Sequence, residues 1–390
     1  MCEIMIMKKI GLCIAYTGTN YGQLLQAYAT QEIIKKYGFQ TEIICYRSGK
    51  NKGIKLSYGA IVVAAKKTRN KIKTKLNRKS EEYSDDLHKI NRLLRIKQAD
   101  SFRKTHLNEV VHCNGIDELR ERSKEYLAVL VGSDQVWLPD IAVTNFFTLR
   151  FAVDGVRRIS YATSLGVSAY PNYVKKSAAD FWKDIDFLSV REEQGKAIIQ
   201  SIIDVDVKVV ADPTYLFTKT EWETLIPSKK VVEDGYVLCY FLGDSDLIKQ
   251  YAKKFAKNQN KRLVSILSDE CNSNDYKYAD EVLTGSSVED FVNLIRNADY
   301  VLTDSFHGLA FSIINQKQVL VFYRKRTDVN ESRNSRIDNI VRSWGIEDRL
   351  VRDPENLNMP ATDIDYDEVI PKVDNLRAYS LSFLSKALEF

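Results

Sequence analysis

The sequence is poor in the residues that usually mark metal and disulfide sites. Its 390 residues include four histidines and six cysteines, and no two cysteines form a CxxC pair. This spacing argues against a zinc site or a disulfide framework and predicts reduced core thiols. The sequence shows no metal-ligand cluster and no glycine-rich GxGxxG fingerprint, so we expect neither a metal nor a bound cofactor.

Long apolar runs are also missing. No segment approaches the roughly 20 apolar residues of a transmembrane helix, and the initial MCEIMIM run is too short for a signal peptide. A hydrophobic content of 44% with a charged content of 28% is typical of a soluble globular protein. We therefore expect a cytoplasmic protein, and its length favours two domains.

Positive charge is concentrated in one segment. Between Arg47 and Lys79 there are twelve Lys or Arg residues and no Asp or Glu, so the net charge of +5 originates there. Tyr58 is the one aromatic residue of this segment, which argues against nucleic-acid binding by base stacking. The stretch LSYGAIVVAAKKTRNKIKTKL joins an apolar run to a cationic run, and this predicts contact between residues 47–79 and an anionic membrane surface. A solvated helical insertion is the alternative.

Buried strand-like runs alternate with helical runs along most of the chain. KKIGLCIAY, a helix closed by Gly38, and QTEIICY form a strand–helix–strand unit typical of a parallel sheet. The rhythm is interrupted from about 47 to 105 and changes character after ADPTYLF, residues 211–217. We predict an α/β fold with two Rossmann-like, doubly wound domains facing a cleft. The first, residues 1–215, carries the basic helical insertion at about 47–105; the second is 216–372; a helix within 373–390 packs back across both.

His307 holds the most informative position in the sequence. The stretch VLTDSFHGLAFSII, residues 301–314, is typical of a buried strand, a polar turn and a helix start. Ligands of open α/β folds bind beyond the carboxyl ends of strands, and a helix N-terminus there suits an anion, with Gly308 allowing a close approach. Histidine titrates in the range of a general acid or base. A hydrogen-bonded loop histidine is the structural alternative.

Polar residues follow other predicted strands. In GSDQVWLPD, residues 132–140, Asp134 suits orienting a sugar hydroxyl or accepting its proton, although a helix cap explains an Asp equally well. Gln135 and Trp137 beside it suit a carbohydrate, although Trp137 also fits a core position. Arg191, in SVREEQG, suits a carboxylate or phosphate, or a salt bridge to a neighbouring glutamate.

Two further regions are less specific. The NYG loop at residues 20–22 lies where many α/β folds bind phosphate, but a tight turn explains it better. The cations of RKR, residues 324–326, and of NSR, residues 334–336, either enter the cleft or remain solvated.

Taken in order, these motifs resemble the polysaccharide pyruvyl transferase family. NYG, LQAYA, GSDQVW, RRISYATSLGVS, SVREEQG, ADPTYLF, TDSFHGLAFSI and NSRIDNIV span nearly the whole chain, and residues 47–105 are the least covered. The resemblance implies a GT-B-like fold, similar to B-type glycosyltransferases. It also implies transfer of pyruvate from phosphoenolpyruvate onto two hydroxyls of one sugar, with release of phosphate. The implied acceptors are bacterial capsules, exopolysaccharides, or their lipid-linked (polyprenyl-pyrophosphate) precursors.

The resemblance also implies roles for individual residues. His307 matches the family's histidine and would protonate the methylene carbon of phosphoenolpyruvate, while Asp134 or Asp304 would accept a hydroxyl proton. Some branches carry Arg where this chain has Ser305, and we expect Arg336 to supply the missing charge. The donor-side candidates are Arg191, Ser305, Gly308, Lys325, Arg326 and Arg336. The acceptor-side candidates are Asn20, Tyr21, Gly22, Ser133, Gln135 and Trp137.

Two other classes of function stay open from the sequence. A nucleotide-sugar glycosyltransferase of similar architecture would need a nucleotide-binding loop and an acidic ribose ligand, and neither is assignable near 280–310. A non-catalytic carbohydrate-binding protein on the same fold is the second alternative. Phosphate release from phosphoenolpyruvate separates the three.

Overall fold

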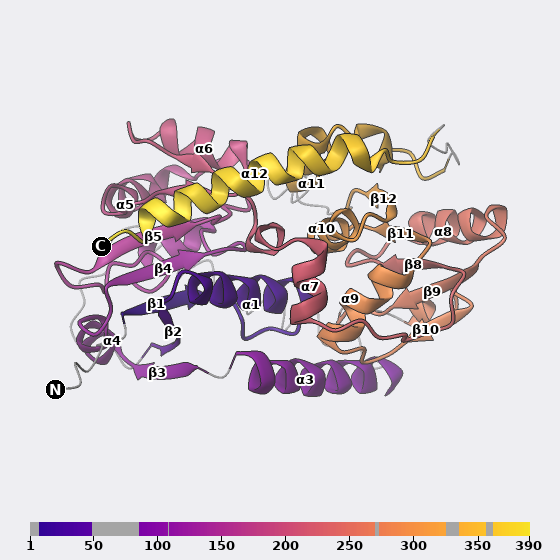
Figure 1. Ribbon diagram of the computed structural model, residues 1–390, viewed down its shortest axis with the longest axis horizontal. Coiled ribbons are helices and arrows are strands. Elements are labelled where there is room, and N and C mark those ends of the chain that lie inside the picture. The colour runs from indigo at the N-terminus through magenta and orange to yellow at the C-terminus, as the bar shows by residue number, and fades with distance from the viewer. Residues whose placement is uncertain (1–7, 49–85, 108, 270–272, 325–334, 356–361) are drawn as a thin grey trace.

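The computed structural model describes residues 8–48, 86–107, 109–269, 273–324, 335–355 and 362–390, and the chain forms two α/β halves along its long axis (Figure 1). The N-terminal half is built on a parallel sheet in the order β3-β2-β1-β4-β5. Its strands are β1 (Lys9–Ile14), β2 (Gln40–Arg47), β3 (Val110–Asn114), β4 (Ala128–Gly132) and β5 (Arg157–Tyr161). A short pair, β6 (Ser189–Val190) and β7 (Lys208–Val209), extends it beyond β5 through isolated bridges.

The C-terminal half repeats this plan with a parallel sheet in the order β10-β9-β8-β11-β12-β13. Its strands are β8 (Tyr236–Tyr240), β9 (Arg262–Ile266), β10 (Glu281–Leu283), β11 (Tyr300–Thr303), β12 (Gln318–Phe322) and β13 (Leu350–Val351). Both sheets are parallel and doubly wound, which confirms the predicted fold class.

Helices cover both sheets and connect the two halves. They are α1 (Tyr21–Lys36), α3 (Asp86–His106), α4 (Ile116–Ser123), α5 (Asn172–Lys183), α6 (Glu193–Gln200), α7 (Lys219–Leu225), α8 (Asp246–Asn258), α9 (Val288–Asn297), α10 (Phe306–Ile314), α11 (Ser335–Trp344) and α12 (Tyr366–Ala387). One hydrophobic core runs from α1 into α9 and α10, so the two halves meet at the amino end of α1.

The two sheets place their switch points next to this junction. In the first sheet the strand order reverses between β1 and β4, and in the second between β8 and β11. Loops at such a point leave a crevice beyond the carboxyl ends of the strands, where α/β folds bind ligands. Asn20 and Ser133 lie in the loops that follow β1 and β4, and His307 follows β11 in the first turn of α10.

Two long helices lie across both halves on opposite sides (Figure 1). The Arg377 Nε of α12 donates to the Tyr215 carbonyl at 2.7 Å, and the Ser380 hydroxyl accepts from the Ala211 N–H at 2.9 Å. On the other side, Arg95 of α3 donates to the Thr19 and Leu267 carbonyls, which belong to different halves. Within the described ranges, no helix is both long and apolar enough to cross a membrane.

Candidate active site

His307 lies in the first turn of α10, in a position fixed by local hydrogen bonds. The Thr303 hydroxyl donates to the Tyr240 carbonyl at 2.7 Å and accepts from the Ser305 N–H at 3.1 Å. Ser305 then caps α10 by accepting from the Gly308 N–H at 3.3 Å. The His307 side chain is only 6% exposed and therefore sits in an environment shaped by protein groups.

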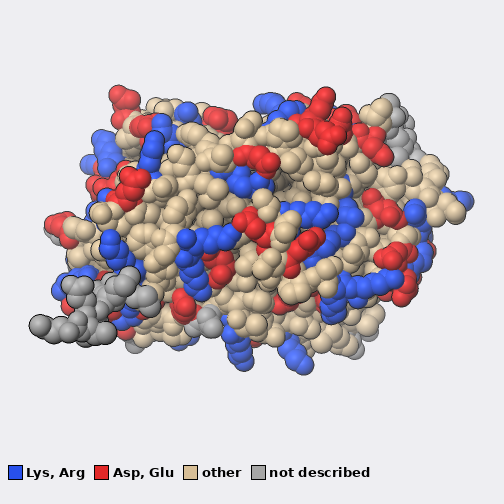
Figure 2. All heavy atoms as spheres, viewed as in Figure 1, with Lys and Arg blue, Asp and Glu red and all other residues tan. Residues whose placement is uncertain are grey.

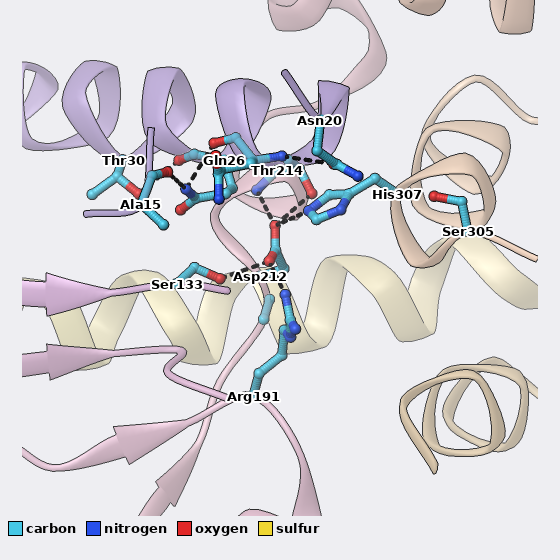
Figure 3. Close-up of polar contacts among 12 residues, drawn as sticks. Ala15, Asn20, Gln26, Thr30, Ser133, Arg191, Asp212, Thr214, Ser305 and His307 are labelled. Carbon is cyan, nitrogen blue, oxygen red and sulfur yellow. Dashed lines mark hydrogen bonds and ion pairs between the residues drawn. The ribbon is translucent and has the colours of Figure 1, made fainter. Parts of the chain in front are cut away.

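The N-terminus of α1 packs directly against His307. Asn20 caps this helix by accepting from the Gln23 N–H at 3.2 Å. A methyl group on Gly22 would lie only 1.9 Å from the His307 Nδ1, so a side chain there would displace the imidazole. Two helix N-termini, each carrying a partial positive charge, therefore converge at this histidine, as Figure 3 shows.

Asp212 is the centre of the polar cluster (Figure 3). One carboxylate oxygen accepts from Ser133 Oγ at 2.7 Å and from Arg191 Nη1 at 2.8 Å. The other accepts from the Thr214 N–H at 3.0 Å and from its hydroxyl at 2.8 Å, and lies 3.8 Å from His307 Nε2. The carboxylate thus joins four segments that are far apart in the sequence.

The surroundings of Asp212 keep it ionised. Burial raises the pKa of this carboxyl, but the positive charges of His307 and Arg191 and the hydrogen bonds from Ser133 and Thr214 outweigh burial and lower it to about 2. An anion held this firmly beside an imidazole favours the protonated, cationic form of that imidazole. The geometry therefore suits a histidine that donates a proton.

Arg191 supplies a second buried charge. It follows β6, is 5% exposed, and its guanidinium lies 4.2 Å from the centre of the Phe306 ring. Burial lowers the pKa of Arg191, but the negative charges of Glu192, Asp212 and Asp134 raise it overall. Its Nη2 is buried and has no hydrogen-bond partner among the described residues. A buried N–H group in this state favours binding of an anionic ligand.

The GSDQVW loop contributes a sharp turn at the end of β4. Asp134 adopts a left-handed conformation with φ of 64°, which Asp tolerates better than most residues. Its carbonyl accepts from the Val136 and Ser164 N–H groups at 2.8 and 2.9 Å, while its side chain remains partly exposed. The Gln135 Nε2 beside it is buried without a partner among the described residues.

Trp137 does not belong to this polar cluster. It is fully buried, donates from Nε1 to the Phe147 carbonyl at 2.9 Å, and packs against Phe181 and Trp182. Its ring is therefore unavailable to a sugar, which corrects the predicted acceptor role in favour of the core alternative.

Tyr21 is likewise an inter-half core residue. It is 2% exposed, its hydroxyl donates to the Ser286 carbonyl at 2.8 Å, and its ring stacks on Phe291. These contacts connect α1 to the C-terminal half, and they account for a tyrosine at this position without any contact to a sugar acceptor.

Asp304 and Gly308 stabilise the structure around the start of α10, one through hydrogen bonds and the other through close packing. The two carboxylate oxygens of Asp304 accept from the Leu242 and Gly243 N–H groups, both at 2.7 Å, and burial raises its pKa although Arg324 opposes this. A methyl on Gly308 would lie 2.4 Å from the Thr303 hydroxyl, so the glycine is needed for packing against β11. Asp304 is thus better placed to order the loop after β8 than to accept a substrate proton.

The remaining predicted cations are only partly described. Lys325 and Arg326 lie outside the described residues, and of Arg336 the structure gives the backbone position in α11. Arg324 is a described cation at Asp304, the residue before Ser305: its Nε lies 3.7 Å from Asp304 Oδ2, and its Nη2 approaches the Asp304 carbonyl at 3.5 Å.

Sequence reasoning missed Asp212 and Thr214. ADPTYLF marks the predicted domain boundary, and its Asp followed by Pro is in itself a common turn signal. The available signal was an acidic residue set among apolar neighbours, which is costly unless the residue has buried partners.

Comparison with known proteins places the chain in a class of transferases. A family model described as polysaccharide pyruvyl transferase matches residues 20–326, and the chain belongs to that family. The match includes every member of the Asp212 cluster. No curated protein sequence matches the chain.

Among solved structures, the UDP-GlcNAc 2-epimerase of Neisseria meningitidis bound to UDP-GlcNAc is similar at 12% identity and a TM-score of 0.49, over 97% of this chain and 100% of that one. S. aureus MnaA in its UDP co-structure gives 13% identity and 0.49, over 98% and 91%. Acinetobacter baumannii MurG gives 10% identity and 0.47, over 97% and 99%. Within the described part of the chain, no group of three His, Cys, Asp or Glu residues is arranged to hold a metal ion.

Proposed function

We propose that this protein transfers pyruvate from phosphoenolpyruvate onto two hydroxyls of one sugar in a bacterial polysaccharide or its lipid-linked precursor, releasing phosphate. Membership of the pyruvyl transferase family supports the class of reaction. The observation that carries the proposal is the buried cluster in which Asp212 joins His307 to Arg191 at the N-terminus of α10.

His307 is the proposed acid. An enol phosphate becomes electrophilic when its methylene carbon gains a proton, and a positioned imidazolium supplies that proton. The Asp212 carboxylate, 3.8 Å from His307 Nε2, favours the protonated imidazole before the reaction and holds the ring in place. Asp212 is therefore a positioning residue, whereas His307 is the catalytic one.

Arg191 is the proposed donor ligand. Its Nη1 is engaged by Asp212, so the unpartnered Nη2 remains for the carboxylate or the phosphate of the donor. The partial positive charges at the N-termini of α1 and α10 act in the same direction. Together these groups stabilise an anionic donor in a site with little access to water.

Asp134 is the proposed base. Its side chain is partly exposed, and its charge acts on Arg191, so it lies close to the cluster without being locked into it. In the balanced reaction two sugar hydroxyls form two C–O bonds to the central carbon, and the carbon–oxygen bond to phosphate breaks. Of the two hydroxyl protons, the equivalent of one ends on the new methyl group and one on phosphate.

The acceptor and the membrane remain part of the proposal. Asn20, Gly22 and Ser133 border the cluster from the N-terminal half, which supports their predicted place on the acceptor side, whereas Gln135 lies next to Gly166. The predicted contact between residues 47–79 and an anionic membrane lies mostly outside the described residues and stays a prediction.

The proposal is tested by phosphate release. Purified protein is incubated with phosphoenolpyruvate and a panel of lipid-linked and free galactosides and mannosides, and phosphate and the mass of the sugar are followed. We expect acceptor-dependent phosphate release that is abolished by His307→Gln and retained by His112→Gln, a matched change at an exposed position of β3. Turnover of a nucleotide-sugar donor without turnover of phosphoenolpyruvate would overturn the proposal.

A further inference from the structure

We propose that the outer face of α3 docks on an anionic lipid bilayer. This face consists of five large apolar side chains in the first half of the helix, Leu87, Ile90, Leu93, Leu94 and Ile96. The proposal concerns a surface outside the Asp212 cluster, and it stands whether or not the protein transfers pyruvate.

The concentration of exposed apolar residues on α3 is unusual. Seven large hydrophobic residues are exposed in the described part of the chain, and five of them lie within ten residues of this helix. Leu93 is 66% exposed, and Leu87 and Ile90 are 47% and 49% exposed. Single exposed apolar residues need no explanation, but a contiguous group marks a surface that contacts a partner or a membrane.

The helix is held so that this face must point outward. Asn91 donates to the Ser268 carbonyl and accepts from the Gly285 N–H, both at 3.0 Å. Arg95 forms an ion pair with Asp269 and, further along, Ala99 and Phe102 are buried against α1. Residues two positions apart point nearly opposite ways on a helix, so anchoring Asn91 and Arg95 inward turns Leu93 away from the protein.

The charges around the apolar face identify the partner. Exposed cationic residues on the same helix are Lys89, Arg92, Lys97 and Lys104. The exposed acid Asp100 is already paired with Arg103. Figure 2 shows basic side chains projecting from the lower edge of the molecule, where Figure 1 places α3. Apolar side chains surrounded by cations are the combination that binds anionic headgroups and the upper acyl region.

The same charges disfavour the other occupants of this face. A second copy of the chain would bring the same cations face to face across a two-fold axis, which is repulsive. Residues 49–79 of the chain carry eleven Lys or Arg and no acid, so they would bring further positive charge to a cationic helix.

Docking through α3 would place the active site beside the bilayer. Arg95 donates from α3 to the Thr19 carbonyl at 2.8 Å, and Thr19 belongs to the loop that leads to Gly22 and His307. An acceptor with a lipid tail would then reach the cleft while its tail stays in the membrane.

The test is flotation of the full chain with vesicles of phosphatidylglycerol and phosphatidylcholine in equal amounts, at low salt. We expect binding to these vesicles and none to phosphatidylcholine alone. The double variant Ile90→Ser/Leu93→Ser should bind at least about tenfold more weakly, because two inserted aliphatic side chains are lost. Lys97→Gln should weaken binding about fivefold, from about 1 kcal/mol per surface charge.

Tyr379→Ser is the matched control, because Tyr379 is also 47% exposed but lies on α12. It should bind as the unmodified protein does, and thermal unfolding should show all variants folded. The proposal is overturned if the unmodified protein fails to bind, or if the double variant binds equally well. If vesicle binding is lost only when lysines within residues 66–75 are changed to Gln, and not in the α3 variants, then docking belongs to that segment instead. A dimer that dissociates in the double variant would identify the face as a self-association surface.

Discussion

Replacing Asp212 by Asn removes one charge from the centre of the cluster while keeping its shape. The one amide oxygen can still accept on one side, either from the Ser133 hydroxyl or from Thr214, while the NH2 group on the other side only donates. The amide also no longer neutralises Arg191 or His307. We expect two separable effects, one on the free energy of unfolding and one on the pH dependence of activity.

The stability effect follows from the lowered pKa of Asp212. The pKa falls from an ordinary 3.8 to about 2, which corresponds to about 2 kcal/mol at neutral pH. Arg191 would keep its ion pair with Glu192 at 3.3 Å but lose the one with Asp212, which places the total between about 2 and 5 kcal/mol. A group with a depressed pKa stabilises the fold above its unfolded pKa. The difference between the two proteins should therefore be largest at neutral pH and shrink as pH falls from about 4 towards 2.

The activity effect concerns His307. Asp212 Oδ1 lies 3.8 Å from His307 Nε2, close enough for its negative charge to favour the protonated imidazole. Without the carboxylate, the imidazole holds its proton less firmly. The high-pH limb of the kcat/KM profile for phosphoenolpyruvate should therefore move to lower pH.

The assay is phosphate release measured across pH, together with urea unfolding, for Asp212→Asn and for the control Asp206→Asn. Asp206 forms an exposed ion pair with Lys208, so its replacement should change neither quantity measurably. If Asp212→Asn lowers stability but leaves the high-pH limb in place, then Asp212 has only a structural role and does not favour the protonated form of His307.

Three further changes follow from the same geometry. Gly22→Ala should reduce kcat strongly, because its methyl would lie 1.9 Å from His307 Nδ1. The control Gly195→Ala should be tolerated, because its methyl would lie 3.3 Å from the Leu165 side chain. Equal activities of the two variants would contradict the contact between Gly22 and His307. Arg191→Lys should raise the KM for phosphoenolpyruvate by at least about tenfold, since a lysine cannot serve Asp212 and the donor together; an unchanged KM would exclude Arg191 as a donor ligand. Arg324→Ala should also raise this KM if Arg324 supplies the charge absent at Ser305, and Arg324→Lys should raise it less. An effect on KM of Arg336→Ala alone would instead identify Arg336 as the source of that charge, as the sequence predicts.

The local features of the fold could be predicted because each depends on a few consecutive residues. An apolar run followed by TDSFHG has the pattern of a strand, a turn and a helix start, and the structure has β11 ending at Thr303 and α10 beginning at Phe306. The same holds for the strand and helix that surround Asn20. The parallel direction of the strands also follows from the alternation of strands and helices, because parallel strands need crossover connections.

The cluster around Asp212 could not be predicted in this way. Its significance comes from Ser133, Arg191 and His307, which belong to separate parts of the chain and meet only after folding. The acceptor role predicted for Trp137 is wrong for the opposite reason: its local sequence suits a sugar, but the folded chain buries its ring in the core.

Helix α3 shows how tertiary contacts override a periodic pattern. Leu87, Ile90 and Leu94 have the spacing of a core-facing stripe. The structure instead turns the polar Asn91 and Arg95 inward, because backbone carbonyls of both halves accept their hydrogen bonds. The structure thus packs this helix through a side that the spacing of its apolar residues does not indicate.

The central claim is that a proton from His307 converts phosphoenolpyruvate into a pyruvyl donor. It is tested most directly by running the reaction in deuterated water and analysing the sugar product by mass spectrometry and NMR. We predict a ketal whose methyl group retains both donor hydrogens and carries one solvent deuterium, and no such product with His307→Gln. A sugar that has gained phosphate, or a ketal methyl without solvent deuterium, would contradict the account.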